Sequence, residues 1–168
     1  MPLSPLLHRY DQILIDLDGC VWVGDEATPQ APDAIAAGMR IVNGTASPVD
    51  VVAAHDRLDF AELREATRRS SPGSGAIVAA LEYATERTAR TVGKPEPQLF
   101  ATARDHLGPG RPLVVGDGLG PDLGGAAAAG LDAAIVLTGA TSTAQAEAAN
   151  DPAPVAIAET LYTLVCAA

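Results

Sequence analysis

The sequence predicts an α/β protein in which helices cover both faces of a mostly parallel sheet. Short apolar stretches with the residue types of strands alternate along the chain with alanine-rich stretches of helical spacing. Hydrophobic residues make up 48% of the chain but aromatic residues only 4%, which favours a core of small aliphatic side chains in closely packed layers. Because 168 residues are enough for one ordinary domain, we expect a single domain spanning residues 1–168.

Five stretches are predicted to form the strands of this sheet. Their aliphatic side chains follow one another with little interruption, which is typical of strands that are buried on both faces. In chain order they are residues 12–17, 39–42, 112–115, 133–137 and 155–157.

Two helices are predicted between the second and third strands. Residues 59–69 begin at Asp59, a residue type that caps helices, and end in a basic pair that favours the helix C-terminus. Residues 75–86 follow a loop rich in serine, proline and glycine. The apolar face of this second helix, which we expect to lie in the core, consists of Ile77, Val78, Leu81 and Ala84. A last helix is expected at residues 161–165.

Charge and cysteine content exclude several classes of function. A formal net charge of -10 repels phosphate backbones and anionic lipid, which argues against a nucleic-acid or membrane-surface role. The apolar patch before His8 is too short for a signal peptide and no run spans a bilayer, so we expect a cytoplasmic protein. Cys20 and Cys166 lack the spacing of zinc or redox motifs and are expected to be buried free thiols.

Carboxylates follow two of the predicted strands directly. Asp16 and Asp18 end the first strand, and Asp117 follows the third, with Asp122 a few residues later. Solvated loops or helix caps are the alternative explanation. In open parallel sheets, however, the carboxyl ends of the strands border one crevice, where these groups would meet. Oxygen ligands of this kind favour Mg²⁺.

Lys94 supplies the positive charge that such a crevice would need. It lies between glycine and proline in a stiff loop that precedes a predicted helix. A fixed ammonium group near carboxylates suits the binding of a phosphate, although a lysine taken alone is usually solvated.

Together these motifs resemble the phosphatases of the haloacid dehalogenase (HAD) superfamily. The likeness is greatest to the branch of 4-nitrophenylphosphatases, phosphoglycolate phosphatases and glycerol-phosphate phosphatases, and it covers most of the chain outside residues 43–74. The motifs, in the family's order, are Asp16-Leu17-Asp18-Gly19 with Trp22 and Gly24, then Gly93-Lys94-Pro95, then Gly116-Asp117-Gly118-Leu119-Gly120-Pro121-Asp122. The resemblance implies a three-layer, doubly wound, Rossmann-like core.

The resemblance also implies a role for each motif residue. Asp16 would be the nucleophile that forms an aspartyl phosphate, and Asp18 the general acid and later base. Lys94 would neutralise charge on the phosphoryl oxygens. Mg²⁺ would be held by Asp16, the backbone carbonyl of Asp18 and Asp117, with Asp122 in support. The expected activity is Mg²⁺-dependent hydrolysis of small phosphorylated metabolites.

Two departures from the family pattern concern substrate binding. Where the family has a Ser or Thr followed by Asn, the second predicted strand runs into Asn43-Gly44-Thr45, which an ordinary turn also explains. The candidates for contact with the substrate phosphate are therefore Gly19, Asn43 and Thr45. The family branch also inserts a cap domain here, and we expect residues 44–74 to be a vestigial remnant of it.

These departures leave alternatives to an active enzyme with an open, permissive site. One is an impaired relative that keeps a metal or anion site and acts as a binding or assembly module. Another is a purely structural domain. Apolar surface without its cap would also favour self-association as a homo-oligomer.

Overall fold

The computed structural model describes residues 3–42, 74–88 and 93–167. The chain forms two compact units, one comprising Met1–His55 with Val92–Ala168 and the other Asp56–Thr91. The second unit contributes one described helix, α3 (Ser74–Thr85), and everything below concerns the first unit unless α3 is named.

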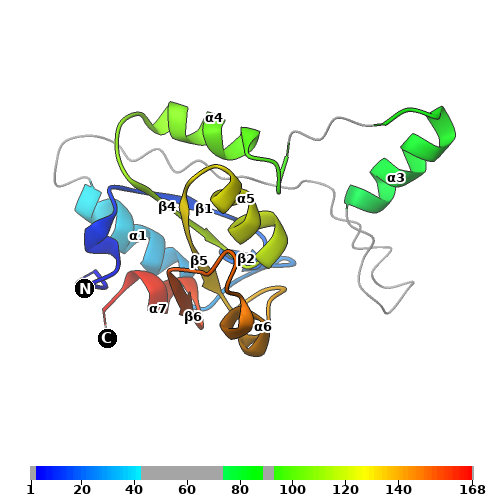
Figure 1. The fold of residues 1–168 in the computed structure, drawn as a ribbon. Helices are drawn as coiled ribbons and strands as arrows, with labels where there is room; N and C mark the ends of the chain where they lie inside the picture. The colour runs from blue at the N-terminus through cyan, green and yellow to red at the C-terminus, as the bar shows by residue number, and fades with distance from the viewer. Residues whose placement is uncertain (1–2, 43–73, 89–92, 168) are drawn as a thin grey trace. The chain divides into compact units, whose positions relative to one another are not determined.

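A parallel sheet of four strands forms the centre of the first unit (Figure 1). The strands lie in the order β1-β4-β5-β6, and each neighbouring pair is parallel. Their bounds are β1 Gln12–Ile15, β4 Pro112–Gly116, β5 Asp132–Val136 and β6 Ala156–Ala158. After β1 the chain makes a small antiparallel hairpin from β2 (Trp22–Val23) and β3 (Glu26–Ala27).

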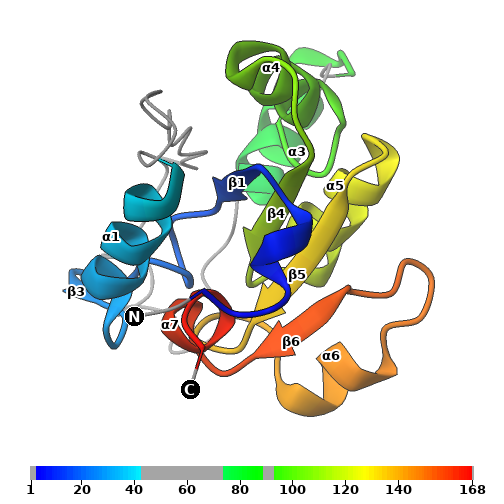
Figure 2. The ribbon, with the colours of Figure 1, turned by 90° about the vertical axis from the view of Figure 1, so that its left-hand side faces the viewer.

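Helices cover the two faces of this sheet, as the views in Figures 1 and 2 both show. On one face lie α1 (Ala31–Val42) and α7 (Leu161–Val165). On the other lie α4 (Gln98–Leu107) and α5 (Gly125–Ala128), which follows a wide helical turn over Leu119–Gly124. A further short helix, α6 (Thr143–Ala148), precedes β6.

The core is divided between the two faces because successive strand residues point to opposite sides of the sheet. Leu113 and Val115 of β4 pack in a cluster with Leu161 and Leu164 of α7. Val114, which lies between them, packs in a second cluster with Phe100 of α4 and Ala126 of α5. This arrangement confirms the predicted three-layer α/β fold.

Most predicted elements are present. Strands are found at four of the five predicted stretches, and helices at 75–86 and 161–165 match α3 and α7. Both cysteines are buried and free, as expected. No helix in the described parts of the chain is both long and apolar enough to cross a membrane.

The strand predicted at residues 39–42 is wrong, because these residues form the last turn of α1. The alanine-rich run before them has high helix propensity, and the helix continues through the β-branched residues to Val42. The expectation that Leu81 and Ala84 lie in the core is also wrong, since both are exposed, Leu81 by 59%.

Two predictions fall outside the described residues. The helix at 59–69 belongs to residues 43–73, which are not described, as does nearly all of the proposed cap remnant at 44–74. The single domain with a vestigial insertion therefore stays a prediction.

Candidate active site

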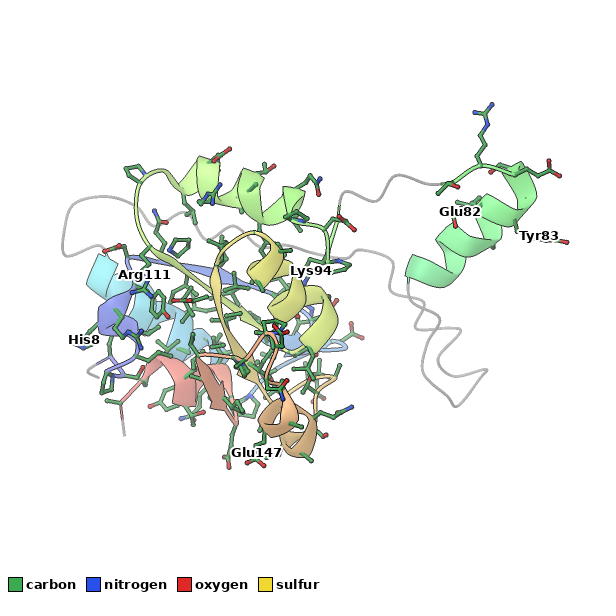
Figure 3. The ribbon with its side chains drawn as sticks, in the orientation of Figure 1. His8, Glu82, Tyr83, Lys94, Arg111 and Glu147 are labelled. Carbon is green, nitrogen blue, oxygen red and sulfur yellow. The ribbon has the colours of Figure 1, made fainter. Side chains whose placement is uncertain are left out.

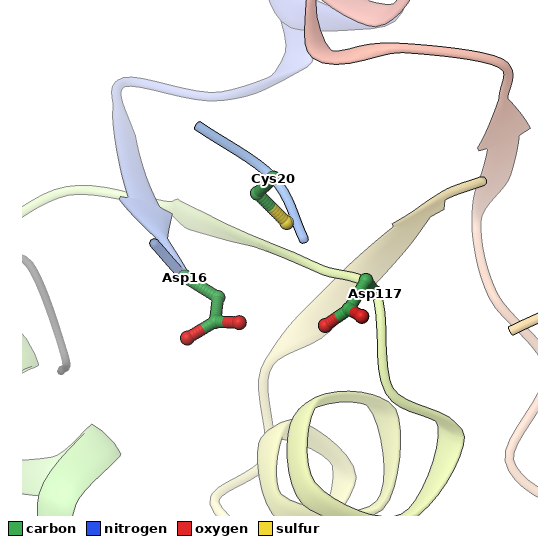
Figure 4. Close-up of side chains that lie close together, drawn as sticks. All are labelled: Asp16, Cys20 and Asp117. Carbon is green, nitrogen blue, oxygen red and sulfur yellow. The ribbon is translucent and has the colours of Figure 1, made fainter. Parts of the chain in front are cut away.

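The ends of two neighbouring strands bring the first two acidic residues together. Asp16 follows β1 and Asp117 follows β4, and the parallel register pairs Ile15 with Val115. The Asp16 backbone N–H donates to the Val115 carbonyl at 2.8 Å, which carries the pairing one residue beyond the strand. Figure 4 shows both carboxylates directed into the same space. They lie at the carboxyl edge of the sheet, where the sequence predicts a site.

Lys94 joins two acidic residues from different segments. Its Nζ lies 2.6 Å from Oδ1 of Asp16 and 2.7 Å from Oδ1 of Asp122. The side chains are 14%, 11% and 3% exposed for Lys94, Asp16 and Asp122 respectively, so these ion pairs are shielded from water. Figure 3 shows Lys94 in the loop that leads into α4. This loop is closed by a hydrogen bond of 2.9 Å from the Glu96 N–H to the Gly93 carbonyl.

Asp122 is fixed by the glycine-rich turn after β4. Its Oδ2 accepts a hydrogen bond of 2.9 Å from the Gly118 N–H, while Oδ1 faces Lys94. A Cβ at Gly116 would collide with the Asp122 side chain, so the close approach requires glycine there. The turn therefore aims a buried carboxylate at the ammonium group.

Asp117 is held by a loop that the sequence analysis did not single out. The Ala140 N–H donates to Oδ2 of Asp117 at 2.5 Å, and the Thr141 hydroxyl donates to the Asp117 carbonyl. The Thr138 hydroxyl donates to the Gly19 carbonyl and so ties the same loop to the first motif. The one sequence feature that could have indicated this loop is its position, immediately after the strand at 133–137.

Cys20 is a neighbour of the acidic group that was not expected. One ligand atom each from Asp16, Cys20 and Asp117 lie within 4.8 Å of one another. Burial, followed by the nearby carboxylate charges, raises the pKa of the Cys20 thiol, which stays protonated. The thiol donates to the Val115 carbonyl at 3.9 Å. The charged donors are therefore oxygens, a set that fits a hard divalent cation such as Mg²⁺.

Burial and crowding of like charge dominate the electrostatics. Burial, with the charge of Asp122, raises the pKa of Asp16 to about 6, against the opposing effect of Lys94. Burial also raises the pKa of Asp117, although the Ala140 N–H acts to lower it. Burial alone would lower the pKa of Lys94, but its two carboxylate partners outweigh this and raise it. The negative charge is thus only partly compensated, as is common at functional sites.

Asp18 is placed differently from the other acidic residues. Its side chain is exposed, and its Oδ1 accepts a hydrogen bond of 2.7 Å from Nε1 of Trp22. The group of mutually close ligand atoms found in the described residues includes Asp16 and Asp117 but not the Asp18 side chain.

The structure brings together Asp16, Lys94, Asp117 and Asp122 of the predicted site. Gly19 lies against the carboxylate of Asp117, and its N–H donates to the Trp22 carbonyl at 2.7 Å. The remaining candidates for substrate contact, Asn43 and Thr45, lie outside the described residues.

Comparisons with known proteins find relatives for this chain. The model of a family described as HAD-hydrolase-like matches residues 91–164. Chronophin from Bos taurus is 37% identical over 103 residues, which are 60% of this chain and 34% of that protein. A phospholysine phosphohistidine inorganic pyrophosphate phosphatase from Xenopus laevis is 30% identical over 138 residues, 81% of this chain and 49% of that protein.

A bacterial relative has higher identity over a shorter stretch. The D-glycerol 3-phosphate phosphatase of Mycobacterium tuberculosis (strain ATCC 25618 / H37Rv) is 48% identical over 71 residues, 42% of this chain and 20% of that protein. The chain therefore spans half or less of the length of these three relatives.

Solved structures share the fold. A 4-nitrophenylphosphatase from Thermotoga maritima matches with a TM-score of 0.69 at 17% identity, over 96% of this chain and 98% of that chain. The glycerol phosphate phosphatase of Mycobacterium tuberculosis in complex with magnesium matches with a TM-score of 0.67 at 24% identity, over 98% of this chain and 79% of that chain.

The chain belongs to the haloacid dehalogenase superfamily. Within it, the relatives and fold neighbours are of the 4-nitrophenylphosphatase and glycerol-phosphate phosphatase kind, which is the branch that the motif order indicates.

Proposed function

We propose that this chain is a Mg²⁺-dependent phosphatase that hydrolyses small phosphate monoesters through an aspartyl-phosphate intermediate. The observation that carries the proposal is the largely buried ammonium group of Lys94, 2.6 Å from Asp16 and 2.7 Å from Asp122, together with the closeness of Asp117 to Asp16. A nucleophilic carboxylate, a fixed cation and further oxygen ligands are the parts that phosphoryl transfer needs.

Asp16 is the proposed nucleophile. One of its carboxylate oxygens forms a bond to phosphorus while the bond from phosphorus to the alcohol oxygen of the ester breaks. Asp18 gives its proton to the departing oxygen. Water then attacks phosphorus, Asp18 takes a proton from that water, and the bond to Asp16 breaks to release phosphate. Lys94 reduces the repulsion between the Asp16 carboxylate and the anionic ester throughout.

The oxygen donors of the site fit Mg²⁺. We propose that the carboxylates of Asp16 and Asp117 and the backbone carbonyl of Asp18 hold the ion, with Asp122 in support. When bound, Mg²⁺ supplies positive charge to the phosphoryl oxygens and to the Asp16 carboxylate. The magnesium complex of the similar phosphatase from Mycobacterium tuberculosis supports this choice of ion.

The substrate class is a small phosphorylated metabolite, with phosphate contacts proposed at Gly19, Asn43 and Thr45. The names of the similar phosphatases support this class. We place the reaction in the cytoplasm, within a single domain whose residues 44–74 are a cap remnant.

The test is phosphate release from 4-nitrophenyl phosphate with and without Mg²⁺. We expect turnover by the natural chain that EDTA abolishes, and a loss on the order of 10³-fold or more in Asp16→Asn. Equal rates for the two proteins would rule the proposal out.

A binding or assembly module that keeps the metal site is the second candidate. It is favoured by the sequence at Asn43-Gly44-Thr45, which lacks a Ser or Thr where the family binds phosphate. This candidate predicts a rise in melting temperature with Mg²⁺ but no turnover of any ester. Turnover that depends on Asp16 would exclude it.

A further inference from the structure

The single tryptophan of the chain, Trp22, is hydrogen-bonded to Asp18, the one motif aspartate whose side chain is exposed. The indole Nε1–H of Trp22 donates to Oδ1 of Asp18 at 2.7 Å. The carboxylates of Asp16 and Asp122, in contrast, are bonded to the ammonium group of Lys94. The proposed proton donor thus has a partner of its own, on the hairpin that follows β1.

Several hydrogen bonds fix the backbone of this hairpin on both sides of Trp22. The Leu17 carbonyl accepts from the Val21 N–H at 2.9 Å, and the Gly19 N–H donates to the Trp22 carbonyl at 2.7 Å. The far side of the hairpin is tied back by Thr28, whose N–H donates to the Val21 carbonyl at 2.8 Å and whose hydroxyl donates to the Cys20 carbonyl at 2.7 Å. None of these bonds uses the indole N–H.

We propose that Trp22 is a positioning residue that holds the carboxyl group of Asp18 in place for proton transfer to the leaving group. This inference rests on the proposed function, in which Asp18 exchanges that proton. The carboxyl group of an exposed aspartate has several accessible rotamers, and a hydrogen bond from the indole N–H to Oδ1 favours one of them while leaving Oδ2 to carry the proton. Because general acid catalysis requires the donor within hydrogen-bond reach of the departing oxygen, this restriction raises the rate.

The kinetic consequence depends on the ester. An alkyl alcohol is a poor leaving group and needs the proton, whereas 4-nitrophenolate departs without one. The value of kcat/KM reports phosphoryl transfer to Asp16 and excludes the later hydrolysis step, in which Asp18 also takes part. We therefore expect Trp22→Phe to lower kcat/KM about 10-fold for an alkyl phosphate such as glycerol 3-phosphate, and less than about 2-fold for 4-nitrophenyl phosphate.

A second readout does not require activity. Since the chain has a single tryptophan, a protein labelled with ¹⁵N-tryptophan gives a single indole N–H resonance. We expect Asp18→Asn to move this resonance, because it removes the anionic acceptor. The matched control is Asp25→Asn, which neutralises another exposed carboxylate of the same hairpin and should leave the resonance in place. This comparison works even if Trp22→Phe does not fold.

The outcomes separate the two proposals. A change in kcat/KM that is equal for both esters, a rise for the alkyl ester, or an indole resonance that Asp18→Asn does not move would each overturn the positioning role and leave the phosphatase intact. Absence of turnover by the natural chain on both esters would overturn the phosphatase and the positioning role with it. The selective loss on the alkyl ester, with a shifted resonance in Asp18→Asn, is the result we expect.

Discussion

Two features of position 19 require glycine. Its φ of +80° lies in the left-handed region, and a Cβ added there would collide with the Asp117 carboxylate. The turn after the first motif and the close approach of the second acidic strand end therefore depend on the same missing side chain.

Substituting Gly19 tests the approach to Asp117 separately from the turn. We expect Gly19→Ala to lower the free energy of unfolding by about 2 kcal/mol and to weaken Mg²⁺ binding. The control is Gly24→Ala, where φ is +61° and no atom lies within 4 Å of the added Cβ, so only the backbone cost of about 1 kcal/mol applies. Urea denaturation and Mg²⁺ titration measure both quantities. Equal effects of the two variants would contradict the contact with Asp117.

Removing the positive charge of Lys94 should lower the stability of the protein. In Lys94→Met the carboxylates of Asp16 and Asp122 lose their shared partner while they remain buried. We expect a loss of about 3 kcal/mol in the free energy of unfolding, part of which returns in the double variant with Asp122→Asn. Chemical denaturation of the three proteins without metal tests this. A loss below about 1 kcal/mol in Lys94→Met would show that water compensates the carboxylates.

The residues at the strand ends could be predicted from the sequence, and those that support them could not. Asp16 and Asp117 stand out because an acid directly after a buried strand is unusual, and Lys94 stands out by its rigid loop. Ala140, in contrast, contributes its backbone N–H, which every residue except proline has. Cys20 is a small buried residue whose proximity to the carboxylates depends on the turn at Gly19.

At the scale of elements, the sequence pattern located four strands correctly but did not distinguish a strand from a helix at residues 39–42. Residues 112–115 and 133–137 are bounded by turn residues and were predicted correctly. Residues 39–42 have strand-like side chains but continue an alanine-rich run without a break, and local continuity decided in favour of α1. An apolar run of four residues is too short for its periodicity to distinguish a strand from a helix.

The amino ends of three strand segments are joined by a cluster opposite the site. Tyr10, which precedes β1, donates its hydroxyl to Oδ2 of Asp132 at 2.8 Å, and Arg111, which precedes β4, lies 2.7 Å from the same oxygen. The Arg111 guanidinium also lies 4.9 Å from the centre of the Tyr10 ring. Figure 3 shows Arg111 at the other end of the sheet from Lys94.

Removing the Tyr10 hydroxyl should affect stability without affecting the site. We expect Tyr10→Phe to cost about 1 kcal/mol in the free energy of unfolding and to leave phosphatase activity unchanged. The hydrogen bond from Tyr10, followed by Arg111, lowers the pKa of Asp132, so the effect should persist at neutral pH and fade as the pH falls below 3.8 through the folded value. Denaturation of both proteins across this range is the measurement. An equal cost at all pH values would contradict the assignment to ionised Asp132.

For the whole molecule, the raised pKa of Asp16 makes stability without metal depend on pH. Its pKa is about 6 when folded and 3.8 in the reference state, so the protonated form favours folding and this contribution is lost as the pH rises through about 6. We expect the stability of the natural chain relative to Asp16→Asn to fall between about pH 4 and about pH 6.5 and to stay level above about pH 7. The free energies of unfolding of both proteins in EDTA test this.

Mg²⁺ should reverse the trend, because a bound cation favours the ionised carboxylate. We expect the Mg²⁺-induced rise in melting temperature to be larger at about pH 7.5 than at about pH 5, and to be absent in Asp16→Asn. A rise that is the same at both pH values would place the ion elsewhere.

The charges around Lys94 favour one order of binding for the metal ion and the phosphate ester. Three carboxyl groups, those of Asp16, Asp117 and Asp122, surround the one ammonium group of Lys94, and their full ionisation would leave two negative charges. A dianionic ester that approaches before the metal meets this surplus, within a chain whose total charge is -10. A divalent ion brings the balance to zero. We therefore expect the metal to bind before the ester, with the strongest preference for this order at low ionic strength, where screening is weakest.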